Sequence, residues 1–277
     1  AVFGAVLFCI PESPRYLVRR DRETEALTVL RRLGSERQAA ENLQEIRDSY
    51  TGTRKPNLHD LLDKATGKIS GIVWIGMLIA AFQQLSGINV VFYYGPVMWR
   101  AAGFTEAGGL VTTALTGALN VICTLVAIAL VDKVGRKPML FYGAIGMTLC
   151  LGGVAIVFSN APVDAAGALN LGRVSGTIAL LMANGYVACF AITWGPVVWV
   201  LLGEMFPNRM RGLALSIAGT VIWLSNFLIT TSFEPMLETI GLGASYGIYA
   251  GFAGLSILFV YRYLQETRGR KLESMTG

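Results

Sequence analysis

Long apolar runs separated by short polar segments dominate the sequence from residue 69 onward. Six of these runs are long enough to cross a bilayer, which takes roughly 20 residues in a helix. We expect membrane-spanning helices at residues 71–99, 109–131, 138–159, 176–203, 212–233 and 245–261. The pattern therefore predicts an all-α, polytopic membrane protein.

The remaining segments are shorter or more polar. Residues 1–10 are apolar but too short to span, so we interpret them as the end of a preceding transmembrane helix. Residues 11–68 are strongly charged, and their leucines recur at helical spacing, which predicts short amphipathic helices. The expected domains are a cytoplasmic loop at 11–68, a six-span bundle at 69–264 and a cytoplasmic tail at 265–277.

Composition and charge agree with this reading. The chain is 53% hydrophobic and 15% charged, as integral membrane proteins are. Every Lys and Arg except Arg100 and Arg173 lies before the first span, in the loops after spans two and four, or in the tail. By the positive-inside rule, both ends of the six-span unit face the cytoplasm. The expected localisation is the plasma (inner) membrane, as a multi-pass protein. Basic residues divided among such loops do not favour nucleic acid as a partner.

Signs of an enzyme or a cofactor site are missing from the sequence. The cysteines Cys9, Cys123, Cys150 and Cys189 lie in apolar segments without metal-type spacing. We find no nucleophile and base pair and no glycine loop suited to phosphate. We therefore expect no catalytic residues, no metal and no cofactor.

The stretch from Ala80 to Pro96 is unusually polar for a membrane helix. Its amides, serine and tyrosines are costly in lipid unless they face a partner or a wet cavity. A local unwinding at Gly87 would let these side chains face one cavity. Neutral amides and phenols suit a neutral, hydroxyl-rich ligand, and the alternative is helix packing through small polar residues. The residues concerned are Gln83, Gln84, Ser86, Asn89, Tyr93 and Tyr94.

The fourth span carries a second expected break. Gly195-Pro196 interrupts it, because proline removes a backbone donor and opposes the preceding turn. Trp194 and Trp199 flank the break, and aromatic rings stack on the apolar faces of sugars. The alternative for Trp199 is anchoring at the membrane interface. Breaks in spans one and four of six predict a transporter built from two inverted three-helix repeats.

The short turn from Asp132 to Pro138 alternates in charge. It is too short for a domain and predicts a tight hairpin between two helices. Its simplest role is a topology anchor. Asp132 beside Arg136 also permits an ion pair that forms in one transporter state and breaks in another.

Several motifs occur together and in order: P-E-S-P-R, Q-Q-L-S-G-I-N-V-V-F-Y-Y, D-K-V-G-R-K, W-G-P-V-V-W, E-M-F-P-N-R-M-R-G and Q-E-T-R-G. In these motifs the chain resembles the sugar porter family of the major facilitator superfamily, and within it the bacterial sugar–proton symporters. The resemblance implies a twelve-helix fold, of which this chain is the C-terminal half with six spans.

The resemblance also implies roles for individual residues. Ile222 stands where the family often carries an amide, and Asn226 on the same span offers another. The implied sugar-binding residues are Gln83, Gln84, Asn89, Asn120, Phe190, Gly195, Trp199 and Asn226. The implied extracellular gate is Tyr93 with Tyr94. The implied cytoplasmic charge network is Glu12, Arg15, Asp132, Arg136, Glu204 and Arg211.

The expected function is monosaccharide transport by alternating access, proton-coupled in the full-length protein. The alternatives are a facilitative uniporter, a membrane sugar sensor without flux, or a truncated half-transporter. The expected partners are a monosaccharide, the lipid bilayer, the missing N-terminal six-helix half and, in a symporter, protons. The six spans hold no carboxylate in their central parts, so a coupling acid would come from the missing half.

Overall fold

The structure is a computed structural model in which the chain divides into two compact units, Ala1–Pro56 and Asn57–Gly277. Apart from one isolated β-bridge between Leu62 and Ile69, the described elements are helical. The structure describes residues 11–50, 58–62, 67–95, 106–162, 171–207 and 210–268. The expected helix end at residues 1–10 lies outside these ranges.

The first unit contains three short helices, α2 (Pro14–Arg19), α3 (Glu23–Leu33) and α4 (Glu36–Tyr50). Leu17 and Ala26 are buried where these helices meet, while their charged faces remain exposed. Arg47 of α4 donates through Nε to Glu23 of α3 at 3.1 Å. The amphipathic helices predicted from leucine spacing are therefore present.

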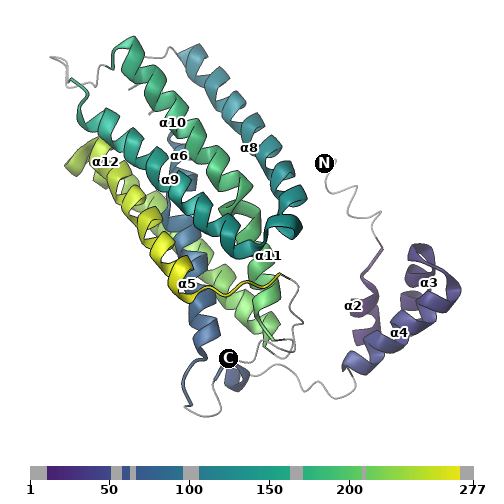
Figure 1. Cartoon of the computed structure of the whole chain (residues 1–277). Helices are drawn as coiled ribbons and strands as arrows, with labels where there is room; N and C mark the ends of the chain where they lie inside the picture. The colour runs from purple at the N-terminus through teal and green to yellow at the C-terminus, as the bar shows by residue number, and fades with distance from the viewer. Residues whose placement is uncertain are drawn as a thin grey trace. The chain divides into compact units, whose positions relative to one another are not determined.

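The second unit is a bundle of long helices (Figure 1). It begins with the short 3₁₀ helix η1 (Leu58–Leu61). Five candidate spans are found among the described residues. The bundle helices are α5 (Gly71–Leu85), α6 (Ile88–Tyr93), α8 (Glu106–Val134), α9 (Arg136–Ser159), α10 (Arg173–Ile192), α11 (Trp194–Met205) and α12 (Arg211–Tyr263).

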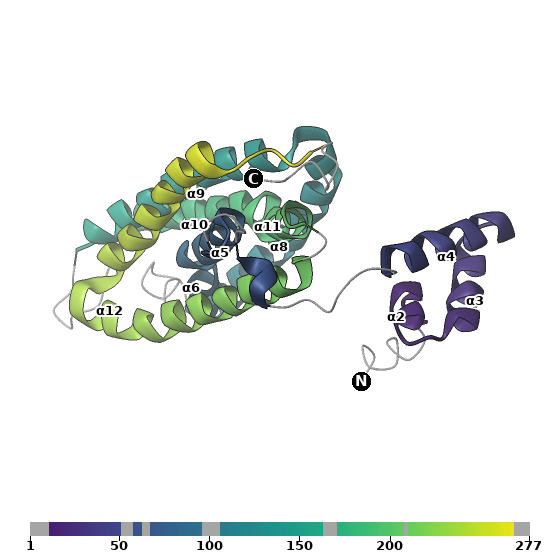
Figure 2. The ribbon, with the colours of Figure 1, turned by 90° about the horizontal axis from the view of Figure 1, so that it is seen from below.

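The longest helix, α12, accounts for the difference between five candidate spans and the six predicted. Its 53 residues would extend about 80 Å if straight, far beyond the ~30 Å apolar core of a bilayer. The chain instead turns at Gly241, whose φ of 79° suits a residue without Cβ. Figure 2 shows α12 folding back on itself into two arms. These arms correspond to the fifth and sixth predicted spans.

Two other spans are interrupted. The first breaks between α5 and α6, where Gly87 has φ 83°, as the sequence predicted. The second breaks at Thr193 (φ −125°, ψ −82°), so the prediction of a break at Gly195-Pro196 was displaced by two residues. The ring of Pro196 opposes the carbonyl four residues earlier and offers it no N–H. That carbonyl belongs to Ile192, and α10 ends there.

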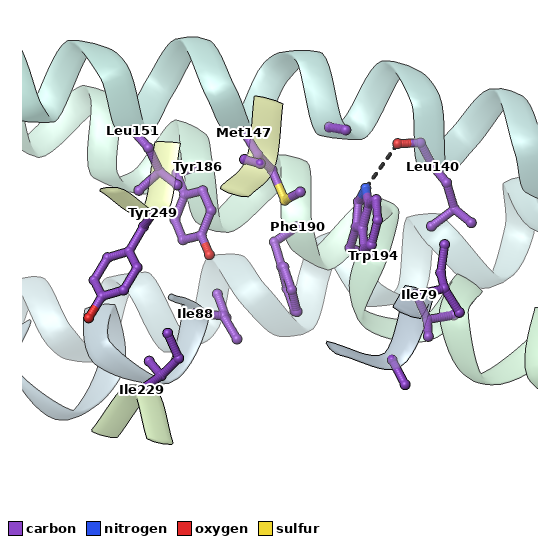
Figure 3. Packing of buried hydrophobic residues seen from close by; sticks show 14 of the residues in the cluster. Ile79, Ile88, Leu140, Met147, Leu151, Tyr186, Phe190, Trp194, Ile229 and Tyr249 are labelled. Atoms are coloured by element: carbon purple, nitrogen blue, oxygen red, sulfur yellow. Dashed lines mark hydrogen bonds between the residues drawn. The ribbon is translucent and has the colours of Figure 1, made fainter. Parts of the chain in front are cut away.

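The core lies where α9 packs against α10 and α12, and where α5 packs against α12. Tyr186, Phe190 and Trp194 follow one another at helical spacing along its centre (Figure 3). Trp194 donates its indole N–H to the carbonyl of Leu140 on α9 at 2.9 Å. The core thus surrounds the Thr193 break.

Helices α9 and α10 approach closely through paired glycines and cysteines. A Cβ added at Gly146 would lie 2.6 Å from Cys189 Sγ, and one at Gly185 would lie 3.0 Å from Cys150 Sγ. Each cysteine therefore occupies the space that a glycine leaves on the facing helix. The same four-residue spacing on both antiparallel helices makes the contact reciprocal.

Candidate functional site

The polar stretch at the first break is divided between the protein interior and a more open side. Gln83 and Ser86 are buried, whereas Gln84 and Asn89 are half-buried. Gly87 allows this division, because the chain changes direction there between α5 and α6. The break therefore separates two amide-bearing surfaces.

Gln83 uses its amide nitrogen within the protein. Nε2 donates to the carbonyls of Trp194 at 2.9 Å and Gly195 at 3.1 Å, both just after the second break. Because both partners are carbonyl oxygens, the nitrogen must be the atom that faces them. Gln83 Oε1 is buried and has no hydrogen-bond partner among the described residues. Gln83 therefore joins the two broken helices and offers a ligand only an acceptor.

Three amides meet on the more open side. Asn89 donates through Nδ2 to Gln84 Oε1 at 2.7 Å and to Asn226 Oδ1 at 2.9 Å. Thr230, one turn after Asn226 on α12, also donates to Asn226 Oδ1, at 3.1 Å. Sequence reasoning missed Thr230, although its four-residue spacing from Asn226 was a usable signal. This cluster brings three predicted binding residues from α5, α6 and α12 together.

The other residues predicted to contact a ligand have different surroundings. Phe190 is buried, and its ring lies 6.4 Å from that of Tyr186. Gly195 accepts the bond from Gln83. Trp199 is 50% exposed on α11. Asn120 is half-buried on α8, and its side chain makes no hydrogen bond to the three-amide cluster in the described structure.

The two tyrosines predicted as a gate differ in packing. Tyr93 is 60% exposed at the end of α6. Tyr94 follows it, and its ring lies 4.6 Å from the ring of Phe233 on the first arm of α12. An aromatic contact of this kind can hold the end of α6 against α12. The described structure therefore places one tyrosine in a packed contact and leaves the other open.

At the opposite end of the bundle, Arg136 binds two carboxylates. Its Nη2 donates to Asp132 Oδ1 at 2.9 Å and to Glu204 Oε1 at 2.6 Å. The Arg136 side chain is only 8% exposed. A buried charge is costly unless it is paired, so the two carboxylates offset the cost of burying the guanidinium. The ion pairs join the end of α8, the start of α9 and the end of α11.

The segment after α12 adds a contact that sequence reasoning missed. Glu266 accepts from the backbone N–H groups of Arg136 (3.0 Å) and Lys137 (2.9 Å), and Thr267 donates to Glu204 Oε2 at 2.7 Å. Partial burial acts to raise the pKa of Glu266, but the backbone N–H bonds outweigh it and hold that pKa below its ordinary value. The Q-E-T-R-G motif marked Glu266 and Thr267 in the sequence, but their partners are evident only in the fold.

The remaining members of the predicted charge network are Glu12, Arg15 and Arg211. Glu12 lies in the first unit, with its carboxylate 3.9 Å from Arg22. The side chain of Arg15 lies outside the described residues. Arg211 donates through Nε to the carbonyl of Phe206 at 3.2 Å. The geometry therefore centres this charge cluster on Arg136 and Glu204.

This arrangement suits reversible binding of a neutral polar molecule. Amides at a helix break can exchange hydrogen bonds with hydroxyls, and the neighbouring aromatic rings offer apolar contact. The charge cluster lies at helix ends, where ion pairs can form or break as helices move. The sequence also matches, over residues 1–277, the family model described as "Sugar (and other) transporter".

The chain belongs to the sugar (and other) transporter family. It is 48% identical over 275 residues to the glucose transport protein of Synechocystis, covering 99% of this chain and 58% of that protein. It is 36% identical over 281 residues to the D-xylose-proton symporter of Escherichia coli, covering 99% of this chain and 54% of that protein. The chain thus spans about half the length of these curated relatives.

The fold agrees with this family assignment. The bundle resembles the major facilitator proton:xylose symporter XylE bound to 6-bromo-6-deoxy-D-glucose, with a TM-score of 0.78 and 36% sequence identity. The match covers 99% of this chain and 55% of the symporter. The chain is therefore a multi-pass membrane protein with about half of a major facilitator fold, and its relatives are transporters rather than enzymes.

Proposed function

We propose that this chain is the C-terminal half of a monosaccharide transporter that works by alternating access. The observation that carries the proposal is the polar site at the α5–α6 break. There, the Gln84–Asn89–Asn226 cluster lies close in the chain to the unpartnered Oε1 of buried Gln83. A buried acceptor without a partner is costly, and a ligand hydroxyl would remove that cost.

The sugar would bind on the side of the bundle that carries the amide cluster. Gln84, Asn89 and Asn226 can exchange their mutual bonds for bonds to hydroxyls, since each amide both donates and accepts. Trp199, half-exposed, offers a ring to the apolar face of a sugar. Asn120 and Phe190 would complete the site from α8 and α10.

A second six-helix half would close this site and supply the opposite wall. Alternating access requires two halves that rock about a central ligand. In this arrangement the charge cluster of Arg136 and Glu204 faces the cytoplasm, and Tyr93 and Tyr94 lie at the outer end. The placement of basic residues in the loops supports this orientation.

Proton coupling would depend on the other half. Asp132 and Glu204 lie at helix ends, and each forms an ion pair with Arg136. The usual proton carriers in membrane proteins are intramembrane carboxylates, so a symporter would need one outside this chain. Without one, the transporter would be a facilitative uniporter.

The test is uptake by the complete gene product that contains this chain. It would be reconstituted in liposomes, and entry of labelled glucose and xylose would be measured with and without a proton gradient. Saturable uptake that competes with unlabelled sugar is expected. Gradient-driven accumulation would identify a symporter, and equilibration alone a uniporter. Sugar binding without flux would instead support a sensor, and neither binding nor flux would refute the proposal.

A further inference from the structure

The two helix breaks are joined by two side-chain contacts that run in opposite directions. Gln83, just before the first break, donates to the carbonyls of Trp194 and Gly195, just after the second. Tyr186, on α10 before the second break, donates its hydroxyl to the carbonyl of Ser86 at 2.9 Å, within the first break. Along the interrupted span formed by α10 and α11, one contact lies before Phe190 and the other lies after it. Together they hold the two interrupted spans against each other.

Ser86 occupies the centre of the first break. The Gly87 N–H bonds to the carbonyl of Gln84, so the carbonyl of Gln83 loses the donor that a continuous helix would supply. Ser86 Oγ replaces that donor at 2.9 Å. Ser86 therefore closes the end of α5 with its side chain, while its own carbonyl is held by Tyr186. Asn89 follows only three residues later, in the first turn of α6.

Tyr186 is well placed to hold this carbonyl. Its side chain is fully buried on α10, and its ring packs beside that of Phe190. Figure 3 shows the Tyr186 hydroxyl directed toward the segment that carries Ile88, the first residue of α6. The hydroxyl also lies 3.3 Å from Ser86 Oγ. A single phenol thus contacts both oxygen atoms of Ser86, the residue between α5 and Gly87.

We propose that Tyr186 is a positioning residue, which acts through Ser86 to set the direction of α6 and so to place Asn89 for the sugar. This inference rests on the proposed function, because it treats Asn89 as a sugar contact. Tyr186 itself does not touch the sugar. Without its hydroxyl, α6 pivots more freely at Gly87, and binding must then order a segment that the wild-type protein already holds.

The test compares two equivalent substitutions in the complete protein. Tyr186→Phe removes the hydroxyl that holds Ser86. Tyr246→Phe is the matched control, because Tyr246 is equally buried and its hydroxyl has no hydrogen-bond partner in the described residues. Amide hydrogen exchange would be followed in the sugar-free protein over residues 83–95, and sugar affinity by calorimetry.

Tyr186→Phe is expected to speed exchange in α6 and to weaken sugar binding by about threefold to tenfold, the range for one buried hydrogen bond. Tyr246→Phe is expected to change neither quantity. In an Asn89→Ala background, Tyr186→Phe is expected to cause little further loss of affinity, because its effect passes through Asn89.

Different outcomes separate this inference from the proposed function. Exchange in Tyr186→Phe equal to that of the control would overturn the inference, as would faster exchange with unchanged sugar affinity. Full additivity with Asn89→Ala, or failure of Tyr186→Phe to fold, would also overturn it. If the wild-type protein bound no monosaccharide, the proposed function would fail, and with it the role in sugar placement; the exchange data would still show whether Tyr186 holds α6.

Discussion

The guanidinium of Arg136 lies 2.6 Å from the carboxylate of Glu204, which joins the first turn of α9 to the last turn of α11. Glu204 also accepts from Thr267, so the segment after α12 is part of the same contact. Two helices and the segment after α12 are therefore held together at one end of the bundle. In an alternating-access protein, such a contact stabilises the state in which that end is closed.

Neutralising Glu204 is expected to open this end. Glu204→Gln keeps the shape but removes the charge opposite Arg136, at a cost of about 1 to 3 kcal/mol to the closed state. The population should shift toward inward-open by roughly fivefold or more. Cysteine accessibility from each side of the membrane would measure the shift. Glu41→Gln, which removes an exposed ion pair with Arg37, is the control and should change nothing. An unchanged accessibility pattern in Glu204→Gln would contradict this role.

Glu266 should stabilise the start of α9 in a pH-dependent way. Glu266→Gln loses the charge at a helix N-terminus and should destabilise the protein by about 1 kcal/mol at pH 7. Because the folded-state pKa of Glu266 is lowered, its contribution is present above the ordinary glutamate pKa of about 4.3 and is lost as pH falls through the lower folded value. Melting temperatures of wild type and variant should therefore converge in acid.

The exposed Glu238→Gln on α12 serves as the control for that experiment. It should melt like the wild type at pH 7. A difference between Glu266→Gln and wild type that stays constant down to pH 3 would show that the carboxylate charge is not responsible.

The sequence predicted features that depend on local physics. Apolar length located the spans, and the break at Gly87 followed from a glycine amid polar side chains. The Thr193 break was misplaced because proline acts four residues before its own position, on Ile192. The hydrogen bonds that Gln83 donates to Trp194 and that Arg136 N–H donates to Glu266 could not be predicted, because they join residues more than 100 positions apart. The roles of individual site residues stay predictions.

Gly87 should not tolerate a side chain. Gly87→Ala forces alanine to φ 83°, which costs about 1 to 2 kcal/mol, and its Cβ would lie 2.8 Å from the ring of Tyr249. A lower melting temperature is expected. The control is Gly117→Ala, in the interior of α8 with open space around it, which should be neutral or stabilising by about 0.5 to 1 kcal/mol. Equal melting temperatures for the two variants would contradict the strain at Gly87.

The reciprocal packing of α9 on α10 should be sensitive to one methyl group. Gly146→Ala places a Cβ 2.6 Å from Cys189 Sγ and should destabilise the protein by about 1 to 3 kcal/mol. Cys189→Ala, which removes that sulfur, should restore much of the loss in the double variant. Gly152→Ala, on the same helix with nothing nearby, should be neutral or slightly stabilising. If the double variant were no more stable than Gly146→Ala, the clash with Cys189 would not be the cause of the lost stability.

The hydrogen bonds of Gln83 predict whether the sugar hydroxyl that contacts it donates or accepts. Both N–H groups of Nε2 are directed to backbone carbonyls, so only Oε1 remains, and it can accept but not donate. The contacting sugar hydroxyl must therefore be a donor. At one ring position, replacing the hydroxyl by hydrogen or by fluorine should weaken binding equally, by about 0.5 to 1.5 kcal/mol, because neither substituent donates. In Gln83→Ala this penalty should disappear, while penalties at the other positions persist. Binding of a series of deoxy and deoxyfluoro sugars to the complete protein would measure it. Retention of affinity by the fluoro sugar where the deoxy sugar loses it would mean that the Gln83 amide donates to the sugar, and that its bonds to α11 break on binding.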